Sequence, residues 1–286
     1  MTRWWQALMP GSKPPVQNRP ANATFFAVGY PKVGNTWLRI TLGNYLAERY
    51  ALASAPLMDA AEFETLTGAG ARAIGEFTHR PLEWTRQTAG DLSHETVVGP
   101  FLGSPVVLLA RYPLDTVVSL FMQERFRNPQ SPFEGSIADF IEHPVFGIDK
   151  LIHFHRLWDE GRRDATVLLW RYEDALADAL REFARVLVFL GEPVDQAMAT
   201  RAVEKASFEN LRALEVSGRQ PRYRSSNLPI FATGDLTNQN ALHNRRGVAG
   251  GYRDEIPAAL IPGLEDRIAR EMPAWFGYQV PPPRNA

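Results

Sequence analysis

Four short apolar runs along the chain predict the strands of a sheet. They cover residues 24–28 (TFFAV), 74–79 (IGEFTH), 106–110 (VVLLA) and 166–170 (TVLLW). The third run is continuously apolar, as in a strand buried on both faces. Stretches with helical spacing separate the runs, for example after Gly34 and after Pro113. Strands that alternate with helices predict an α/β fold: a single domain with a central, mainly parallel β-sheet flanked by helices.

The remaining pattern predicts further helices and one long irregular stretch. A loop with a weak helix is expected at 53–73, and Ser207 is expected to cap a helical turn. From 216 to 251 no periodicity is visible, and such a stretch inside a compact domain is usually functional or mobile. The other helices are expected at 137–161 with a break at Phe146-Gly147, as one long helix that follows Arg171-Tyr172-Glu173-Asp174 and ends at Leu190, at 194–206 and at 257–271.

The N-terminal residues differ from the rest in composition. Residues 10–22 are rich in proline and polar side chains, which is typical of a leader rather than a folded unit. No internal repeat or separating linker follows. We therefore expect an N-terminal leader at 1–23 and one domain at 24–286.

Composition narrows the class of protein. The chain has 286 residues, of which 45% are hydrophobic and 22% charged, enough for a large core. A net charge of −1 argues against a general nucleic-acid-binding surface. The absence of cysteine excludes disulfides, a cysteine nucleophile and thiolate metal sites. No apolar run has the length of a signal peptide or a membrane helix, so we expect a cytoplasmic protein without a membrane span. Assembly into a homo-oligomer stays open.

The loop after the first strand predicts a P-loop-like nucleotide site. A strand, a glycine-bearing loop and a helix in that order present backbone N–H groups at a helix N-terminus, where anions bind. Gly29 and Gly34 have the spacing of a Walker A loop, but Asn35 holds the position of the Walker lysine. The only lysine of the loop is Lys32. A P-loop kinase needs its lysine after the second glycine, so this loop is expected to hold a phosphate-like group differently.

Other polar residues follow the next two predicted strands. His79 ends the second run, and Arg111 follows the third run directly. Pro113 suits the first turn of the helix that follows, and Asp115 suits its positive end. Ligands of open α/β sheets bind at the carboxyl ends of the strands, so these side chains are candidates for one site.

Six segments resemble, in the same order, the motifs of the PAPS-dependent sulfotransferases. These enzymes move a sulfuryl group from 3′-phosphoadenosine 5′-phosphosulfate (PAPS) to a hydroxyl or amine. The resemblance covers roughly residues 24–256 and rests on the following segments: 31–37 (PKVGNTW) for the 5′-phosphosulfate loop, 78–81 (THRP) for the catalytic histidine, 111–119 (RYPLDTVVS) for the 3′-phosphate, 172–174 (YED) and 207–208 (SF) for the adenine side, and 245–250 (RRGVAG) for the late loop that closes on the 3′-phosphate.

The resemblance implies a role for each matching residue. His79 would be the general base, since a neutral imidazole accepts a proton at working pH, and Lys32 would stabilise the leaving group. No metal is expected, and the product would be the desulfated nucleotide PAP. The residues implied to bind PAPS are Lys32, Gly34, Asn35, Thr36, Trp37, Arg111, Ser119, Tyr172, Ser207, Phe208, Arg245, Arg246 and Gly247.

The chain departs from the family pattern at three positions. Val33 replaces the serine of the loop, which removes a side-chain hydroxyl. Phe77 stands where a lysine often precedes the Thr-His pair, which removes one contact to the sulfuryl group. Arg246 replaces a lysine and is still expected to bind phosphate. Glu76 is a rival for the base, because the glycan-directed branch of the family uses a glutamate.

Two other functions and the acceptor stay open at this stage. The chain is alternatively a P-loop-type kinase that uses ATP and Mg²⁺, or a non-catalytic nucleotide-binding module. The acceptor is a small molecule or a glycan, and segments 53–73, 128–150 and 216–244 are expected to line its entrance. An apolar pocket would draw on Phe77, Trp84, Phe101, Phe126, Phe133 and Phe146, whereas an anionic acceptor would meet Arg80, Arg125, Arg127 and Arg222.

Overall fold

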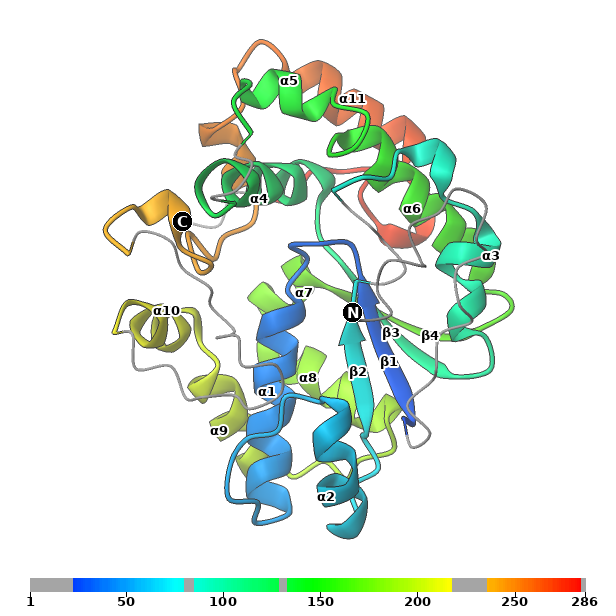
Figure 1. Cartoon of the computed structure of the whole chain (residues 1–286), viewed down its shortest axis with the longest axis vertical. Helices are drawn as coiled ribbons and strands as arrows, with labels where there is room; N and C mark the ends of the chain where they lie inside the picture. The colour runs from blue at the N-terminus through cyan, green and yellow to red at the C-terminus, as the bar shows by residue number, and fades with distance from the viewer. Residues whose placement is uncertain (1–22, 80–84, 129–132, 218–235, 284–286) are drawn as a thin grey trace, which may run out of the picture.

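A four-stranded sheet forms the centre of the molecule (Figure 1). The computed structural model describes residues 23–79, 85–128, 133–217 and 236–283. Most of the predicted leader, as well as Arg80, Pro81, Trp84 and Arg222, therefore lies outside the described residues. The strands are β1 (Phe25–Gly29), β2 (Gly75–Thr78), β3 (Pro105–Ala110) and β4 (Thr166–Arg171). Their order is β2-β1-β3-β4 and every pair is parallel, which confirms the predicted parallel sheet.

The register of the strands brings their carboxyl ends to one edge. Gly29 of β1 lies opposite Leu109 of β3, while Val28 pairs with Thr78 of β2. At the far side, Ala110 pairs with Arg171 of β4. The residues that follow each strand are consequently neighbours, as expected for a ligand site in an open parallel sheet.

The core is built around β1 and β3, whose apolar residues are buried on both faces. Helices cover the sheet from two sides: α1, α8 and α9 lie on one side, and α3, α6 and α11 on the other (Figure 1). The helices are α1 (Asn35–Arg49), α2 (Phe63–Gly68), α3 (His94–Val97), α4 (Pro113–Phe126), α5 (Ile137–Ile141), α6 (Ile148–Gly161), α7 (Tyr172–Ala177), α8 (Ala179–Phe189), α9 (Gln196–Lys205), α10 (Phe208–Val216) and α11 (Ile261–Glu271).

The predicted starts of two helices are confirmed, and one predicted helix is wrong. Pro113 occupies the first turn of α4, and Ser207 caps α10 by accepting a hydrogen bond from the backbone N–H of Asn210. The predicted single long helix that ends at Leu190 is wrong. Asp178 leaves the helical conformation and splits it into α7 and α8, and its carboxylate accepts a hydrogen bond from the N–H of Arg181 at 3.0 Å. A short polar side chain that can cap a new helix explains the break.

The irregular stretch predicted after residue 216 is confirmed where the structure describes it. After α10 ends at Val216, residues 236–256 contain only two short 3₁₀ turns, η5 (Gln239–Ala241) and η6 (Gly251–Asp254). We call residues 236–256 the late segment. Within the described ranges, no helix is long and apolar enough to cross a membrane.

Candidate functional site

A cavity of about 390 Å³ opens at the carboxyl ends of the strands. Its wall is formed by the β1–α1 loop, the residues that follow β2, β3 and β4, one face of α4, the start of α10 and the late segment. Every residue that the sequence assigned to the site lines this cavity, with the exception of Ser207. Six segments that are far apart in the sequence therefore converge as expected.

The β1–α1 loop presents an anion-binding helix start. Gly34 adopts a left-handed conformation with φ 105° just before α1. A Cβ added there would lie 3.0 Å from the Tyr172 ring and 3.1 Å from the Trp170 ring, so glycine is required twice over. Among the described residues, no side chain caps α1. Its first N–H groups, at Asn35 and Thr36, are thus placed to bind an anion in the cavity.

Lys32 places an amine at this helix start. Its Nζ donates a hydrogen bond to Oε1 of Gln123 at 3.2 Å. Burial, together with the guanidinium charges of Arg127 and Arg111, lowers the pKa of Lys32 to about 7. Two buried carboxylates, Glu215 and Glu124, act in the opposite direction. A bound anion would favour the charged form of Lys32, so the pKa of this amine should rise when an anion binds.

His79 follows β2 and is held by the neighbouring strand. Its Nδ1 lies 2.9 Å from the carbonyl oxygen of Gly29. A carbonyl only accepts, so Nδ1 carries the proton and Nε2 carries the lone pair of the neutral ring. Burial lowers the pKa of His79, and so does the charge of Lys32. The amide nitrogen of Asn35 lies 3.5 Å from both ring nitrogens, at the limit of hydrogen bonding. His79 is therefore a neutral imidazole with a basic nitrogen.

Glu76 does not contribute to the cavity wall. It lies in the middle of β2, where successive side chains point to opposite faces of the sheet. His79 lies just beyond the end of β2 and lines the cavity, whereas Glu76 does not. The structure thus places His79, rather than its rival, beside Lys32.

Arg111 is fixed at the tip of β3. Its guanidinium carbon lies 4.3 Å from the centre of the Tyr172 ring, in a cation–π contact. The same group donates to the carbonyl oxygen of Val248 at 3.2 Å and, more weakly, to that of Lys32 at 3.4 Å. Its Nε is buried and has no hydrogen-bond partner among the described residues. A buried donor of this kind suits an anionic ligand.

One face of α4 extends the site beyond Arg111. Ser119 and Gln123 both line the cavity, four residues apart and thus one turn from each other. Ser119 was predictable from its spacing from Arg111, whereas Gln123 belongs to no motif and was not predicted. Helical periodicity from Ser119 was the signal that could have identified it.

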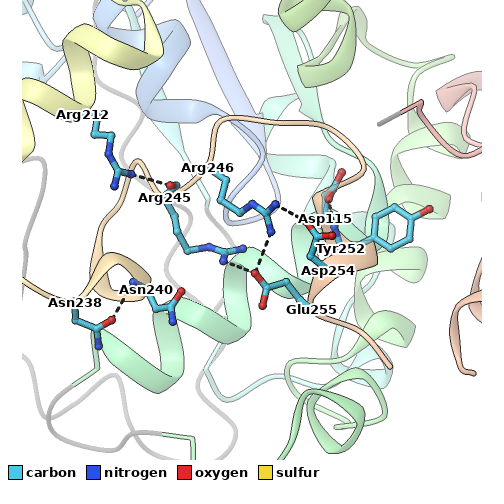
Figure 2. Close-up of polar contacts among 9 residues, drawn as sticks. All are labelled: Asp115, Arg212, Asn238, Asn240, Arg245, Arg246, Tyr252, Asp254 and Glu255. Atoms are coloured by element: carbon cyan, nitrogen blue, oxygen red, sulfur yellow. Dashed lines mark hydrogen bonds and ion pairs between the residues drawn. The ribbon is translucent and has the colours of Figure 1, made fainter. Parts of the chain in front are cut away.

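Figure 2 shows the late segment as a set of charge pairs. Arg245 contacts Glu255 at 2.5 Å, and Arg246 contacts Glu255 at 3.3 Å and pairs with Asp254. Both arginines line the cavity, as the resemblance implied. Their charges, however, already have carboxylate partners within the same segment, which the motif did not indicate.

Asp115 anchors the late segment to α4 (Figure 2). The Asp115 carboxylate is buried and accepts hydrogen bonds from the backbone N–H groups of Gly250 at 2.7 Å and Tyr252 at 2.9 Å. The sequence analysis placed Asp115 at the positive end of α4. It does lie in the first turn, but its oxygens bind a segment 135 residues away.

Aromatic rings form the apolar part of the wall. Trp37 meets Trp170 and Tyr172 edge to face, with ring centroids 5.7 and 5.5 Å apart. Phe208 lines the cavity beside Gly247, where any added Cβ would collide with the Phe208 ring. The hydroxyl of Ser207 is used to cap α10, so its predicted contact with a nucleotide stays a prediction.

His243 and Asn244 also line the cavity; they belong to the segment 216–244 that was expected at the acceptor entrance, but neither was predicted as a site residue. Neither belongs to a motif, and a stretch without periodicity gave no sign of which side chains point inward. The described residues contain no cluster of three or more His, Cys, Asp or Glu side chains able to hold a metal ion. The expectation that no metal is needed stays a prediction.

Comparisons with known proteins add independent information. The sequence model of the sulfotransferase domain family matches residues 23–276. Human sulfotransferase 1C2 is 21% identical over 268 residues, which cover 85% of this chain and 81% of the relative. Cytosolic sulfotransferase 17 of Arabidopsis thaliana is 24% identical and covers 92% of this chain and 78% of its own length.

Solved structures share the fold. The structure of mouse sulfotransferase SULT7A1 complexed with PAP has a TM-score of 0.61 at 22% identity, and the similarity covers 92% of this chain and 88% of that one. Retinol dehydratase in complex with retinol and PAP has a TM-score of 0.56 at 19% identity, over 88% of this chain and 81% of the other. At these identities the similarity establishes the α/β architecture.

Proposed function

Since the chain belongs to the sulfotransferase domain family, we propose that it transfers a sulfuryl group from PAPS to a hydroxyl or amine of a small acceptor molecule. One observation carries this proposal. A single cavity brings together Lys32 at a helix start, a neutral His79, and Arg111 with the two arginines of the late segment. This set contains a cation for a leaving group, a base and a second anion site.

The residues fit the two charged ends of PAPS, which supplies the activated sulfuryl group. The start of α1, Thr36 and Lys32 would hold the 5′-phosphosulfate. Arg111, with its buried Nε, would hold the 3′-phosphate together with Ser119 and Arg246. Trp37 and Phe208 would accept the adenine between these ends, because flat rings stack well on aromatic side chains.

His79 and Lys32 would perform the chemistry. Nε2 of His79 would take the proton of the acceptor as its oxygen or nitrogen attacks sulfur, since Nδ1 is held by Gly29. Lys32 would neutralise the negative charge that grows on the leaving oxygen, as cations do in phosphoryl transfer. The geometry does not support the kinase alternative. The position of the Walker lysine is held by Asn35, whose amide nitrogen lies beside the His79 ring.

The comparisons support a small-molecule acceptor over a glycan. One structural neighbour binds retinol and another structure of retinol dehydratase holds androsterone with PAP. The aromatic side chains predicted for an acceptor pocket include Phe133 and Phe146, but these pack against each other and do not line the cavity. We also propose a cytoplasmic location, because one relative is named a cytosolic sulfotransferase.

A thermal-shift experiment with purified protein tests the proposal without a known acceptor. PAP keeps both phosphates and should raise the melting temperature, whereas AMP lacks the 3′-phosphate and should do far less. A ligand that binds only the native state stabilises by about 2.7 kcal/mol at a hundredfold excess over Kd. For a domain of this size this corresponds to roughly 2–4 °C per kcal/mol. Added Mg²⁺ should change nothing.

Two arginine variants provide the test and its control: Arg111, directly after β3, and Arg125, in α4. Arg111→Ala should reduce the PAP shift to the level of AMP. Arg125→Ala removes an exposed arginine that bonds to the carbonyl of Gly135, and it should keep the full shift. A large shift with ATP and Mg²⁺ that ignores Arg111, with none for PAP, would refute a PAPS-dependent enzyme.

A further inference from the structure

His243 contributes to the cavity wall at the end that holds the proposed reacting groups. The residue follows η5 in the late segment and lines the same cavity as Lys32 and His79. The charges of Lys32, Arg127 and His79 all act on its ring. His243 therefore lies close to the position at which the sulfuryl group would be transferred.

The backbone around His243 is fixed from two directions. The buried carboxylate of Glu215 in α10 accepts hydrogen bonds from the N–H groups of His243 at 2.5 Å and Asn244 at 2.9 Å. Arg212, one turn earlier in α10, donates to the carbonyl oxygens of Asn244 at 2.8 Å and Arg245 at 2.7 Å; the second of these bonds is drawn in Figure 2. Such anchoring holds a side chain of an irregular segment in one place.

Arg127 determines which nitrogen of His243 carries the proton. A guanidinium nitrogen of Arg127 lies 3.1 Å from Nδ1 of His243. A guanidinium only donates, so Nδ1 must accept and the proton of the neutral ring lies on Nε2. Burial holds the pKa of His243 well below its usual value, and Lys32 and Arg127 lower it further. His243 is therefore a neutral hydrogen-bond donor over the physiological pH range.

The two histidines of the cavity are thus opposite tautomers. His79 has its proton on Nδ1, held by a carbonyl, and offers a lone pair at Nε2. His243 has its lone pair on Nδ1, held by an arginine, and offers an N–H at Nε2. One ring can accept a proton and the other can only donate a hydrogen bond, so the two cannot exchange roles.

We propose that His243 contacts the donor directly, and that its Nε2–H donates a hydrogen bond to an oxygen of the sulfuryl group. This inference rests on the proposed function. Sulfuryl oxygens only accept hydrogen bonds, so a fixed neutral donor suits them and does not compete with His79 for the acceptor proton. The residue also compensates for Phe77, which packs against Phe25 and does not line the cavity.

A pair of variants separates the two nitrogens of His243. In His243→Asn the amide oxygen can still accept from Arg127, but no N–H extends as far as Nε2. In His243→Gln the longer amide can place an N–H near the position of Nε2. The dissociation constants of PAPS and PAP are measured by calorimetry for the wild type and both variants. PAP lacks the sulfuryl group, so its affinity reports only on an intact nucleotide site.

We expect His243→Asn to weaken PAPS relative to PAP by about tenfold to a hundredfold, the usual size of a hydrogen bond to a charged group. His243→Gln should recover the ratio to within about threefold of the wild type, because it restores the donor. An unchanged ratio in both variants would overturn the role of His243, as would a loss confined to the KM of an acceptor. If the wild type binds neither nucleotide, the proposed function fails first, and the two failures are thereby distinguished.

Discussion

The two halves of the cavity wall are positioned by different means. On one side, Lys32, His79 and Arg111 directly follow or flank parallel strands, and the sheet fixes their Cα positions through its register. On the other side, the late segment has no strand and only short 3₁₀ turns. Its position depends on side chains from α4 and α10: Asp115, Arg212 and Glu215 bind its backbone N–H and C=O groups.

Because of this difference, substitutions in the two halves of the wall should have different effects. Side chains at strand ends are held by many backbone hydrogen bonds, so a substitution there removes a functional group and leaves the wall in place. In the late segment the buried carboxylates of Asp115 and Glu215 each hold two backbone N–H groups, so one substitution there displaces part of the wall. Variants of the first kind should impair turnover, and variants of the second kind should impair binding and stability together.

The largest effect is expected at His79. His79→Asn removes the basic nitrogen at Nε2 and should lower kcat by about 10²–10⁴, the range of general base catalysis. PAP affinity should stay near that of the wild type, because the strand end is unchanged. Turnover is measured with ³⁵S-labelled PAPS and an acceptor identified by screening.

Glu76→Gln is the matched control, since Glu76 lies in the same strand but outside the cavity wall. It should leave kcat within about twofold of the wild type, because a half-buried side chain outside the cavity wall does not touch the reacting groups. The opposite pattern, a crippled Glu76→Gln and a mild His79→Asn, would transfer the role of base to Glu76.

Lys32 should give the next largest effect. Its backbone has φ 76°, a left-handed conformation that strains lysine and alanine alike and that glycine tolerates. Lys32→Gly should therefore lower kcat by about 10²–10³, as the loss of a transition-state donor does. Lys32→Ala should show the same kcat, with a melting temperature below that of Lys32→Gly, because alanine keeps the strain that glycine relieves. A glycine variant with unchanged kcat would remove Lys32 from the mechanism.

The pH dependence of binding provides a second signature of Lys32. The pKa of Lys32 without ligand is about 7, and a bound phosphate must raise it. Binding of PAP then takes up a proton, and the affinity should fall as pH rises from 7 to 9, where phosphate is already fully charged. Calorimetry in buffers of different ionisation enthalpy measures this uptake, which should be absent in Lys32→Gly.

The anchor of the late segment should produce a smaller effect on binding and a clear one on stability. Asp115→Asn replaces an oxygen that accepts from Gly250 or Tyr252 by an NH₂ group, which leaves a buried N–H facing a donor. An unsatisfied buried group costs about 1–3 kcal/mol, so the melting temperature should fall and PAP should bind about tenfold more weakly. Asp266→Asn, an exposed site on α11, should alter neither. Full PAP affinity in Asp115→Asn would contradict the anchoring role.

The sequence predicted the strand-end side of the site better than the late segment, for a physical reason. A motif such as PKVGNTW specifies its own local conformation, and parallel strands then bring Lys32, His79 and Arg111 together. The four strands and the caps at Pro113 and Ser207 were predictable for the same reason. The break at Asp178 was not, because the apolar spacing continues through it.

Long-range side-chain contacts could not be predicted from one sequence. The bond between Arg127 and His243 joins positions 116 residues apart, and the bonds of Asp115 span 135 and 137 residues. No local pattern indicates which carboxylate binds which backbone N–H. The motif identified Arg245 and Arg246 but not their pairing with Asp254 and Glu255, which changes what is expected of them.

The smallest effect is expected from that pairing. Glu255 contacts both Arg245 and Arg246, whose side chains are 16% and 33% exposed, so water partly screens the pairs. A phosphate would have to share these guanidinium groups with the carboxylate. Glu255→Gln keeps an oxygen to position the arginines and removes the competing charge. PAP should then bind slightly more tightly, by about twofold to fivefold at low salt, in keeping with the 0–1 kcal/mol of exposed ion pairs.

Asp254→Asn is the companion variant, since Asp254 pairs with Arg246 whereas Arg245 pairs with Glu255. It should give a smaller gain than Glu255→Gln, because it releases one arginine rather than two. Both gains should vanish as salt is raised, since screening weakens the competing pair and the phosphate contact alike. If PAP instead binds more weakly to Glu255→Gln, the carboxylate of Glu255 holds Arg245 and Arg246 in place for the phosphate. The acidic residues of the late segment would then favour phosphate binding rather than compete with it.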